Sequence, residues 1–229
     1  MHRQRLKRSA EEYYKCSMTL SISNLEISSA LVRYGVSADE QLCDRIRSYI
    51  ALLLRWNERI SLTTVTHPGE ILKFHFGESF FAISAVPIQF GRLADVGSGA
   101  GFPGIPLAML SPELQVMLIE SNLKKSAFLS EVVRSLELPS VNVIRSRIED
   151  VQTGPDKFDF VTARAVGSFE DLLTWSVRSL AESGKLVLWV GGEDGAGISR
   201  ISQWSWRKPI QIPSSENRFL LVGVPKATK

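Results

Sequence analysis

The stretch that decides the fold runs Leu93-Ala94-Asp95-Val96-Gly97-Ser98-Gly99-Ala100-Gly101-Phe102-Pro103-Gly104-Ile105-Pro106-Leu107-Ala108. It opens with apolar residues, breaks into a run of glycines and resumes with residues that favour a helix. This pattern predicts a buried strand, a tight turn and a helix. Glycine has no Cβ, so the turn can adopt positive φ and let a ligand lie directly on the backbone. The start of the helix directs free N–H groups and a positive dipole end to the same place.

The spacing of the glycines narrows the class of ligand. A dinucleotide-binding turn, G-x-G-x-x-G, would need glycine where Phe102 stands. The motif present is D-x-G-x-G-x-G, and the next predicted strand, residues 115–119, ends in Glu120. In a βαβ unit that carboxylate lies beside the glycine turn and can bind both hydroxyls of a ribose. A nucleoside ligand is favoured over the alternative that Glu120 is only a solvated strand end. No Walker lysine follows the glycines, so S-adenosylmethionine fits better than a nucleoside triphosphate.

Strands and helices alternate on both sides of this stretch in the sequence. Predicted strands end at Gly97, occupy residues 115–120, 141–144, 158–163 and 185–190, and finish with two strands in 204–212 and 218–224. The helix that Ser168 caps is predicted to run to about Leu180 and to be ended by Gly184. Alternation predicts an α/β fold, a mostly parallel seven-stranded sheet with helices on both faces, closed by antiparallel strands. Ligands then bind at the carboxyl ends of the strands.

The chain is expected to divide into three parts. Residues 1–23 form a basic arm with Arg3, Arg5, Lys7 and Arg8, either a loose tail or an RNA-gripping segment. Residues 24–90 form a small helical region, and residues 91–229 form a Rossmann-like domain. Within the helical region Asn57, Thr63 and His75 are polar among apolar neighbours. We interpret them as structural hydrogen-bonding residues in preference to the rim of a pocket.

Composition limits the other possibilities. The 229 residues are 44% hydrophobic and carry a net charge of +3, which permits nucleic-acid binding without requiring it. The two cysteines and three histidines show no metal-ligand spacing, so neither a disulfide framework nor a metal site is expected. No apolar run reaches the length of a membrane span, and the N-terminus has no signal-peptide core. We expect a cytoplasmic monomer.

Three further segments at the predicted carboxyl edge of the sheet are candidates for a role near the ligand. The turn after the third strand carries residues 147–150, close to where an adenine ring would contact the backbone. Arg164 ends the fourth strand, where it orients a base or the cofactor carboxylate, or else is a structural residue tied to a carboxylate such as Asp95. Residues 191–197 are rich in glycine and form either a mobile lid or a plain surface loop.

The stretch 95–108 resembles the signature of the bacterial small-subunit ribosomal RNA guanine-N7 methyltransferases, also called the glucose-inhibited division protein B family. The similarity continues through residues 120–129, 145–149 and 158–165, and upstream around Trp56-Asn57 and His75. It covers most of the chain from about Leu42 to Val190. It implies an S-adenosylmethionine-dependent methyltransferase that modifies N7 of one guanosine in 16S rRNA, either as RNA or in a small ribosomal subunit assembly intermediate.

The resemblance also implies roles for individual residues. By the family's pattern Gly97 and Phe102 line the methionine end of the cofactor pocket, Ile148 and Glu149 contact the adenine, and Arg164 lies by the cofactor and the incoming base. Arg164 is the one residue predicted to be catalytic. The predicted cofactor-binding set is Asp95, Gly97, Ser98, Gly99, Gly101, Phe102, Glu120, Ile148, Glu149 and Arg164. Val190-Gly191 stands where the family commonly has a lysine-glycine pair.

The chemistry of N7 methylation agrees with what the sequence contains. Guanine N7 already bears a lone pair, so the enzyme has to supply alignment and needs no general base. Ala163-Arg164-Ala165 stands where exocyclic-amine methyltransferases carry Asn/Asp-Pro-Pro-aromatic, and neither cysteine lies near the glycine turn to support cytosine-C5 chemistry. Two alternatives stay open: a methyltransferase acting on another RNA or a small molecule, and a non-catalytic RNA-binding protein that senses the cofactor.

Overall fold

The N-terminal part of the protein is a set of helices. The computed structural model describes residues 22–152, 154–165 and 168–226, so most of the predicted basic arm lies outside the described residues. Helix α2 (Asn24–Val32) begins with a capping box between Ser23 and Glu26, and Asp39 caps α3 (Glu40–Asn57). Helix α4 (Pro68–Ile71), the π-helical segment η1 (Leu72–Gly77) and α5 (Glu78–Ala85) then follow one another without a break.

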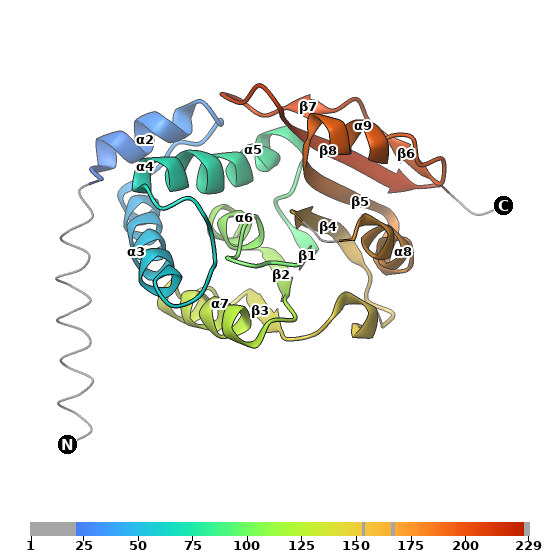
Figure 1. Cartoon of the computed structure of the whole chain (residues 1–229), viewed down its shortest axis with the longest axis horizontal. Coiled ribbons are helices and arrows are strands. Elements are labelled where there is room, and N and C mark those ends of the chain that lie inside the picture. Colours follow the sequence, from blue (N-terminus) through green and yellow to red (C-terminus); the bar gives the residue numbers. More distant parts are fainter. Residues whose placement is uncertain (1–21, 153, 166–167, 227–229) are drawn as a thin grey trace, which may run out of the picture.

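A single mixed sheet forms the centre of the molecule (Figure 1). Its order is β3-β2-β1-β4-β5-β8-β6, and the short strand β7 also pairs with β8. The strands are β1 (Gly91–Val96), β2 (Leu114–Ile119), β3 (Val141–Ile144), β4 (Phe158–Arg164), β5 (Leu180–Gly191), β6 (Trp204–Trp206), β7 (Ile210–Gln211) and β8 (Arg218–Pro225). Strands β1 to β5 are parallel, and β8 runs antiparallel to β5, β6 and β7. The predicted α/β fold with antiparallel closure is confirmed, with two short strands in place of one in residues 204–212.

The two faces of the sheet carry separate hydrophobic cores. Successive side chains of a strand point to opposite faces of the sheet. Leu93 therefore belongs to the core on one face, and Ala94 belongs to the core on the other. Helices α2 to α5 pack on the first face together with α6 (Gly104–Leu110) and α7 (Leu123–Ser135). Helices α8 (Phe169–Ser179) and α9 (Gly192–Ile198) cover the second face, as Figure 1 shows. The helical region therefore shares a core with the sheet that carries the glycine turn.

Two local expectations at the C-terminal end of the chain are wrong. Helix α8 has the predicted Ser168 cap and ends at Ser179, next to the predicted end at about Leu180, but Gly184 does not end the helix because it lies inside β5. There it occupies an irregularity of the β4–β5 pairing, where a Cβ would come within 2.8 Å of the Phe158 carbonyl oxygen. Residues 191–197, expected to be a lid or loop, are mostly in α9. Burial of Gly195 and Ile198 against the second core outweighs the poor helix propensity of the glycines.

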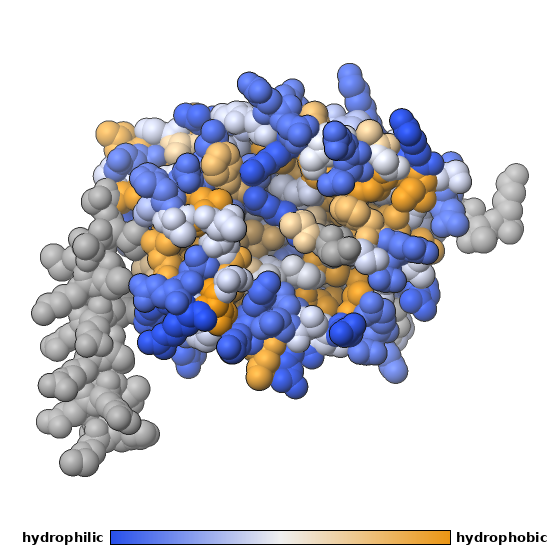
Figure 2. Space-filling view, viewed as in Figure 1, coloured by the Kyte–Doolittle hydropathy of each residue, from blue (hydrophilic) through white to orange (hydrophobic). Residues whose placement is uncertain are grey.

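The surface of the described residues is mixed in character. Figure 2 shows hydrophilic side chains protruding over one face, with apolar groups visible between them. Within the described ranges, none of the helices is both long and apolar enough to cross a membrane.

Candidate active site

The glycine turn between β1 and α6 has the backbone conformation that its sequence requires. Gly97, Gly99 and Gly101 all have positive φ, at 66°, 56° and 86°. The amides of Gly97 and Ser98 donate to the carbonyl of Ile119 at 2.9 and 3.1 Å, which ties the turn to the end of β2. A Cβ on Gly101 would meet the packed side chains of the first core, whereas one on Gly99 would have only the Gly97 carbonyl within 4 Å. The turn therefore presents open backbone at Gly99 and is closed at Gly101.

Asp95 supports this turn from beneath. Its Oδ1 accepts a hydrogen bond from Thr162 Oγ1 at 2.8 Å, and its Oδ2 accepts one from the Gly104 amide at 3.2 Å. Burial raises the pKa of the Asp95 carboxyl to about 7, although the hydrogen bonds from Thr162 and Gly104 act in the opposite direction. The side chain thus joins β1 to β4 and to the start of α6.

Glu120 faces the turn from the end of β2, as the sequence predicts. Its Oε2 accepts from the Gly99 amide at 2.9 Å, and its Oε1 accepts from the Asn122 amide at 2.8 Å. A carboxylate has about four lone-pair sites, so each oxygen retains capacity for another donor. Glu120 is therefore fixed in place by the backbone and still able to bind hydroxyl groups.

A cavity of about 490 Å³ opens between the glycine turn and Glu120. Six of the ten predicted cofactor-binding residues line it: Gly97, Ser98, Gly99, Phe102, Glu120 and Arg164. Asp95 and Gly101 lie behind the turn, outside the lining. Ile148 and Glu149 also lie outside it, on the short 3₁₀ helix η2 (Ile148–Asp150) that follows β3. Because β3 pairs with β2 in parallel, η2 stands at the same carboxyl edge as Glu120.

The helical region supplies a wall of this cavity that the sequence did not predict. The lining includes residues 61–64, from the loop between α3 and α4, together with His75. Asn57 holds the loop, accepting from the amides of Leu62 and Thr63 and donating to the Thr63 carbonyl at 2.8 to 3.0 Å. Asn57 thus has the structural role expected of it. A polar loop joining two helices gives no sequence signal that it folds against a sheet edge.

Thr63 and His75 are both structural residues and part of the cavity wall. Thr63 Oγ1 lies 2.8 Å from His75 Nε2, and the His75 ring packs 4.8 Å from the ring of Phe102. Burial, followed by the nearby charge of Arg164, lowers the pKa of His75 to about 4. The imidazole is therefore neutral at physiological pH. Phe102 also stacks on Tyr49 of α3, with ring planes 6° apart, so the aromatic end of the cavity is rigid.

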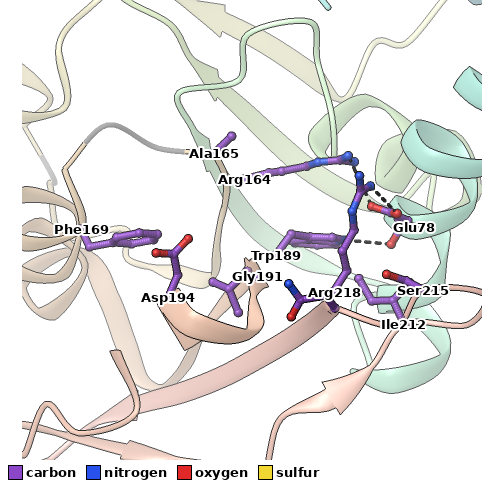
Figure 3. A pocket seen from close by; sticks show the side chains of 12 residues that line it. Glu78, Arg164, Ala165, Phe169, Trp189, Gly191, Asp194, Ile212, Ser215 and Arg218 are labelled. Atoms are coloured by element: carbon purple, nitrogen blue, oxygen red, sulfur yellow. Dashed lines mark hydrogen bonds and ion pairs between the residues drawn. The ribbon is translucent and has the colours of Figure 1, made fainter. Parts of the chain in front are cut away.

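Arg164 is tied to a carboxylate, but to Glu78 and not to Asp95. Its Nη1 donates to the Phe74 carbonyl at 2.7 Å, and its Nη2 lies 3.3 Å from Glu78 Oε2 (Figure 3). Glu78 is buried at the start of α5 and also accepts from Arg218 Nη1 at 2.6 Å. Burial raises the pKa of Glu78 and lowers the pKa of Arg164, while the attraction between their charges opposes both shifts.

The sheet order, the glycine turn and the facing carboxylate define a class I S-adenosylmethionine-dependent methyltransferase fold. Solved structures with this fold include an S-adenosylmethionine-dependent methyltransferase from Aquifex aeolicus, with a TM-score of 0.56 and 14% identity over 64% of this chain and 88% of that one. The ribosomal protein L11 methylase from Lactobacillus delbrueckii gives 0.54 and 16%, over 68% and 80%. The chain belongs to the rRNA small subunit methyltransferase G family, GidB, whose family model matches residues 42–200.

Individual relatives support the same assignment. The ribosomal RNA small subunit methyltransferase G of Roseiflexus castenholzii is 35% identical over 88% of this chain and 91% of its own length. The protein of that name from Desulfitobacterium hafniense is 38% identical over 70% and 68%. The residues matched by the family model include most of the helical region and strands β1 to β5.

Proposed function

We propose that this protein transfers a methyl group from S-adenosylmethionine to N7 of a guanosine in 16S rRNA. We further propose that the protein is a cytoplasmic monomer. Its substrate is either the RNA itself or a small-subunit assembly intermediate. The observation that carries it is the cavity at the carboxyl edge, where the glycine turn faces Glu120 and Arg164 stands at the end of β4. Membership of a family described as small-subunit rRNA methyltransferases supports the same substrate class.

The residues of the cavity suit S-adenosylmethionine. Glu120 has acceptor capacity left for two ribose hydroxyls, and the open backbone at Gly99 lets a nucleoside lie against the turn. Ile148 and Glu149 would hold the adenine beyond β3, and Phe102 with Gly97 would border the methionine part. The volume of about 490 Å³ is within the range of small-molecule sites.

The reaction requires the protein mainly to align the methyl group of the cofactor with guanine N7. Bound S-adenosylmethionine supplies an electrophilic methyl group on a sulfonium. Guanine N7 has a lone pair at neutral pH, so no side chain has to remove a proton before the methyl group is transferred. His75 is neutral and bonded to Thr63, which fits a wall that shapes the cavity without acting as a base. Arg164, fixed by Phe74 and Glu78, would orient the base or the cofactor carboxylate.

The test replaces the target guanosine by 7-deazaguanosine in a 16S rRNA transcript, which removes N7 and keeps the shape of the base. We expect the transcript to bind and methyl transfer to stop. The pH–rate profile on normal transcript should show no ascending limb from a catalytic base. Methyl transfer to the 7-deaza transcript would assign the reaction to another atom of the RNA.

A further inference from the structure

A second cavity lies beside the cofactor cavity and shares two of its residues. It has a volume of about 460 Å³, and Arg164 and Ala165 line both cavities. Its other walls come from the starts of α5, α8 and α9, from the end of β5 and from the segment that leads into β8. Strand β8 runs antiparallel to β5, so its first residue, Arg218, pairs with the last residue of β5, Gly191. This reversal brings Arg218 to the carboxyl edge, next to the place where a methyl acceptor has to bind.

One side of the second cavity carries two guanidinium groups on a single buried carboxylate. Glu78 binds Arg164 through Oε2 and Arg218 through Oε1, and Trp189 Nε1 donates to the Glu78 backbone carbonyl at 2.8 Å. The two arginines and one glutamate leave a net charge of +1. The guanidinium of Arg218 is held by the Glu78 carboxylate and by the Phe74 ring, whose centroid lies 4.9 Å away. The Arg218 side chain is 43% exposed, so it still has N–H groups free to donate to a ligand.

The opposite side of the cavity carries an acceptor and an aromatic ring. Figure 3 shows Asp194 of α9 and Phe169 of α8 across the cavity from Arg164 and Arg218. Asp194 is exposed in the first turn of α9, where a carboxylate is favoured. Asn217 Oδ1 accepts from the Gly192 amide at 3.1 Å and so links the start of α9 to the segment before β8. Asp194 is thus placed on a helix fastened at its beginning.

Guanine matches this arrangement of donors and acceptors. Its O6 accepts hydrogen bonds, and its N1–H and N2–H₂ groups donate them from the adjoining edge. We infer that the second cavity holds the acceptor guanine, taken out of its RNA strand, with Arg218 donating to O6 and Asp194 accepting from N1–H and N2–H₂. Adenine offers a donor where guanine has O6 and an acceptor at N1, so the same groups reject it. The inference rests on the proposed function and names the residues that select its acceptor base.

The contacts also suit the chemistry at N7. A guanidinium that binds O6 alone leaves the N7 lone pair available to accept the methyl group. Methylation gives the ring a positive charge, which makes N1–H a stronger donor. A carboxylate that accepts from N1–H therefore binds the base more tightly as the reaction proceeds, which is the condition for accelerating it.

The test uses the full chain and two 16S rRNA transcripts, with guanosine or inosine at the methylated position. Inosine keeps O6, N7 and N1–H and lacks only the 2-amino group. A hydrogen bond to a charged group is worth about tenfold to 100-fold, so the wild type should prefer guanosine by about that factor in kcat/KM. Asp194→Ala, which removes the acceptor, should bring the ratio close to one, whereas Asp194→Asn keeps one acceptor oxygen and should lower the ratio less. Glu193→Gln, an exposed neighbour outside the cavity, should leave the ratio unchanged.

Arg218 is tested by a variant that keeps the charge beside Glu78. Arg218→Lys should lower kcat/KM on the guanosine transcript about tenfold or more, because an ammonium group lacks the fork, and should leave the affinity for S-adenosylmethionine unchanged in calorimetry. A wild-type guanosine-to-inosine ratio in Asp194→Ala would overturn the inference. So would variants that change only the salt dependence of RNA binding, since that result assigns the cavity to a phosphate. A wild type that methylates neither transcript would overturn the proposed function, and the inference with it.

Discussion

Adding one methyl group to Gly99 or to Gly101 tests whether the turn is built as the contacts indicate. Both residues have positive φ, so alanine at either position costs about 1–2 kcal/mol of backbone strain. At Gly99 the added Cβ has only the Gly97 carbonyl within 4 Å, at 3.7 Å, and nothing further opposes it. We therefore expect Gly99→Ala to lower the free energy of unfolding by about 1–2 kcal/mol.

At Gly101 the same methyl group enters a filled space. It would lie 2.7 Å from Ile105 Cδ1 and closer still to Tyr49 Oη, which donates to the Ala100 carbonyl at 2.5 Å. Overpacking costs about 1–3 kcal/mol, and losing the Tyr49 hydrogen bond costs about 1 kcal/mol more. Together with the strain, Gly101→Ala should lower the free energy of unfolding by about 3–6 kcal/mol.

The assay is urea denaturation of both variants, with Gly154→Ala as a control, since an added Cβ there meets nothing within 4 Å. S-adenosylmethionine calorimetry on the folded proteins separates stability from binding. Gly99→Val should bind the cofactor about 100-fold more weakly, because its branches enter the cavity that Gly99 lines. Equal stability losses for Gly99→Ala and Gly101→Ala would refute the packing argument. Undiminished binding by Gly99→Val would show that the ligand does not lie on this backbone.

Three further predictions concern the loop held by Asn57, the buried His75 and the two lysines at the start of α7. Asn57→Ala removes three hydrogen bonds that hold residues 62–63 and should weaken S-adenosylmethionine binding about tenfold in calorimetry; an unchanged affinity would mean that this loop does not contact the ligand. The pKa of His75 is about 4 in the folded protein against 6.5 when unfolded, so its stabilising contribution is complete above pH 6.5 and is lost as the pH falls through 4. Between pH 7 and pH 3 the wild type should therefore lose about 3 kcal/mol more unfolding free energy than His75→Gln, and parallel urea curves would contradict this. Lys124→Ala and Lys125→Ala, at the start of α7, should each reduce the slope of log K against log salt for rRNA binding by about one unit or less, whereas unchanged slopes would make these lysines a solvated face.

The part of the site formed by neighbouring segments could be predicted from the sequence. The glycine turn and Glu120 are separated by one helix, and a parallel βαβ unit allows only one way of placing them side by side. The spacing of the glycines and Glu120 in the sequence was therefore enough to predict that they face each other. The same reasoning found Arg164 at the end of β4, because each strand of a parallel sheet delivers its last residue to the same edge.

The rest of the site depends on contacts between residues far apart in the chain. Arg164 and Arg218 meet on Glu78, although Glu78 precedes Arg218 by 140 residues. In the sequence Glu78 looks like any charged residue of a helix, and nothing local indicates that it is buried. The glycines of α9 likewise predict a loop, since intrinsic propensity is local and the packing of Ile198 against the sheet is not.

The two cavities depend on different parts of the architecture. The cofactor side is centred on β1, β2 and the turn between β1 and α6. The second cavity is formed by Glu78, from the helical region that precedes the sheet, and by Arg218, from the antiparallel strand β8. These two residues meet only because β8 runs in the opposite direction to β5. Substitutions at Asp194 or Arg218 should therefore change the choice of base and leave cofactor affinity intact. Substitutions at Gly99 should weaken cofactor binding and leave the choice of base intact. Arg164, which lines both cavities, is the residue at which the two properties are coupled.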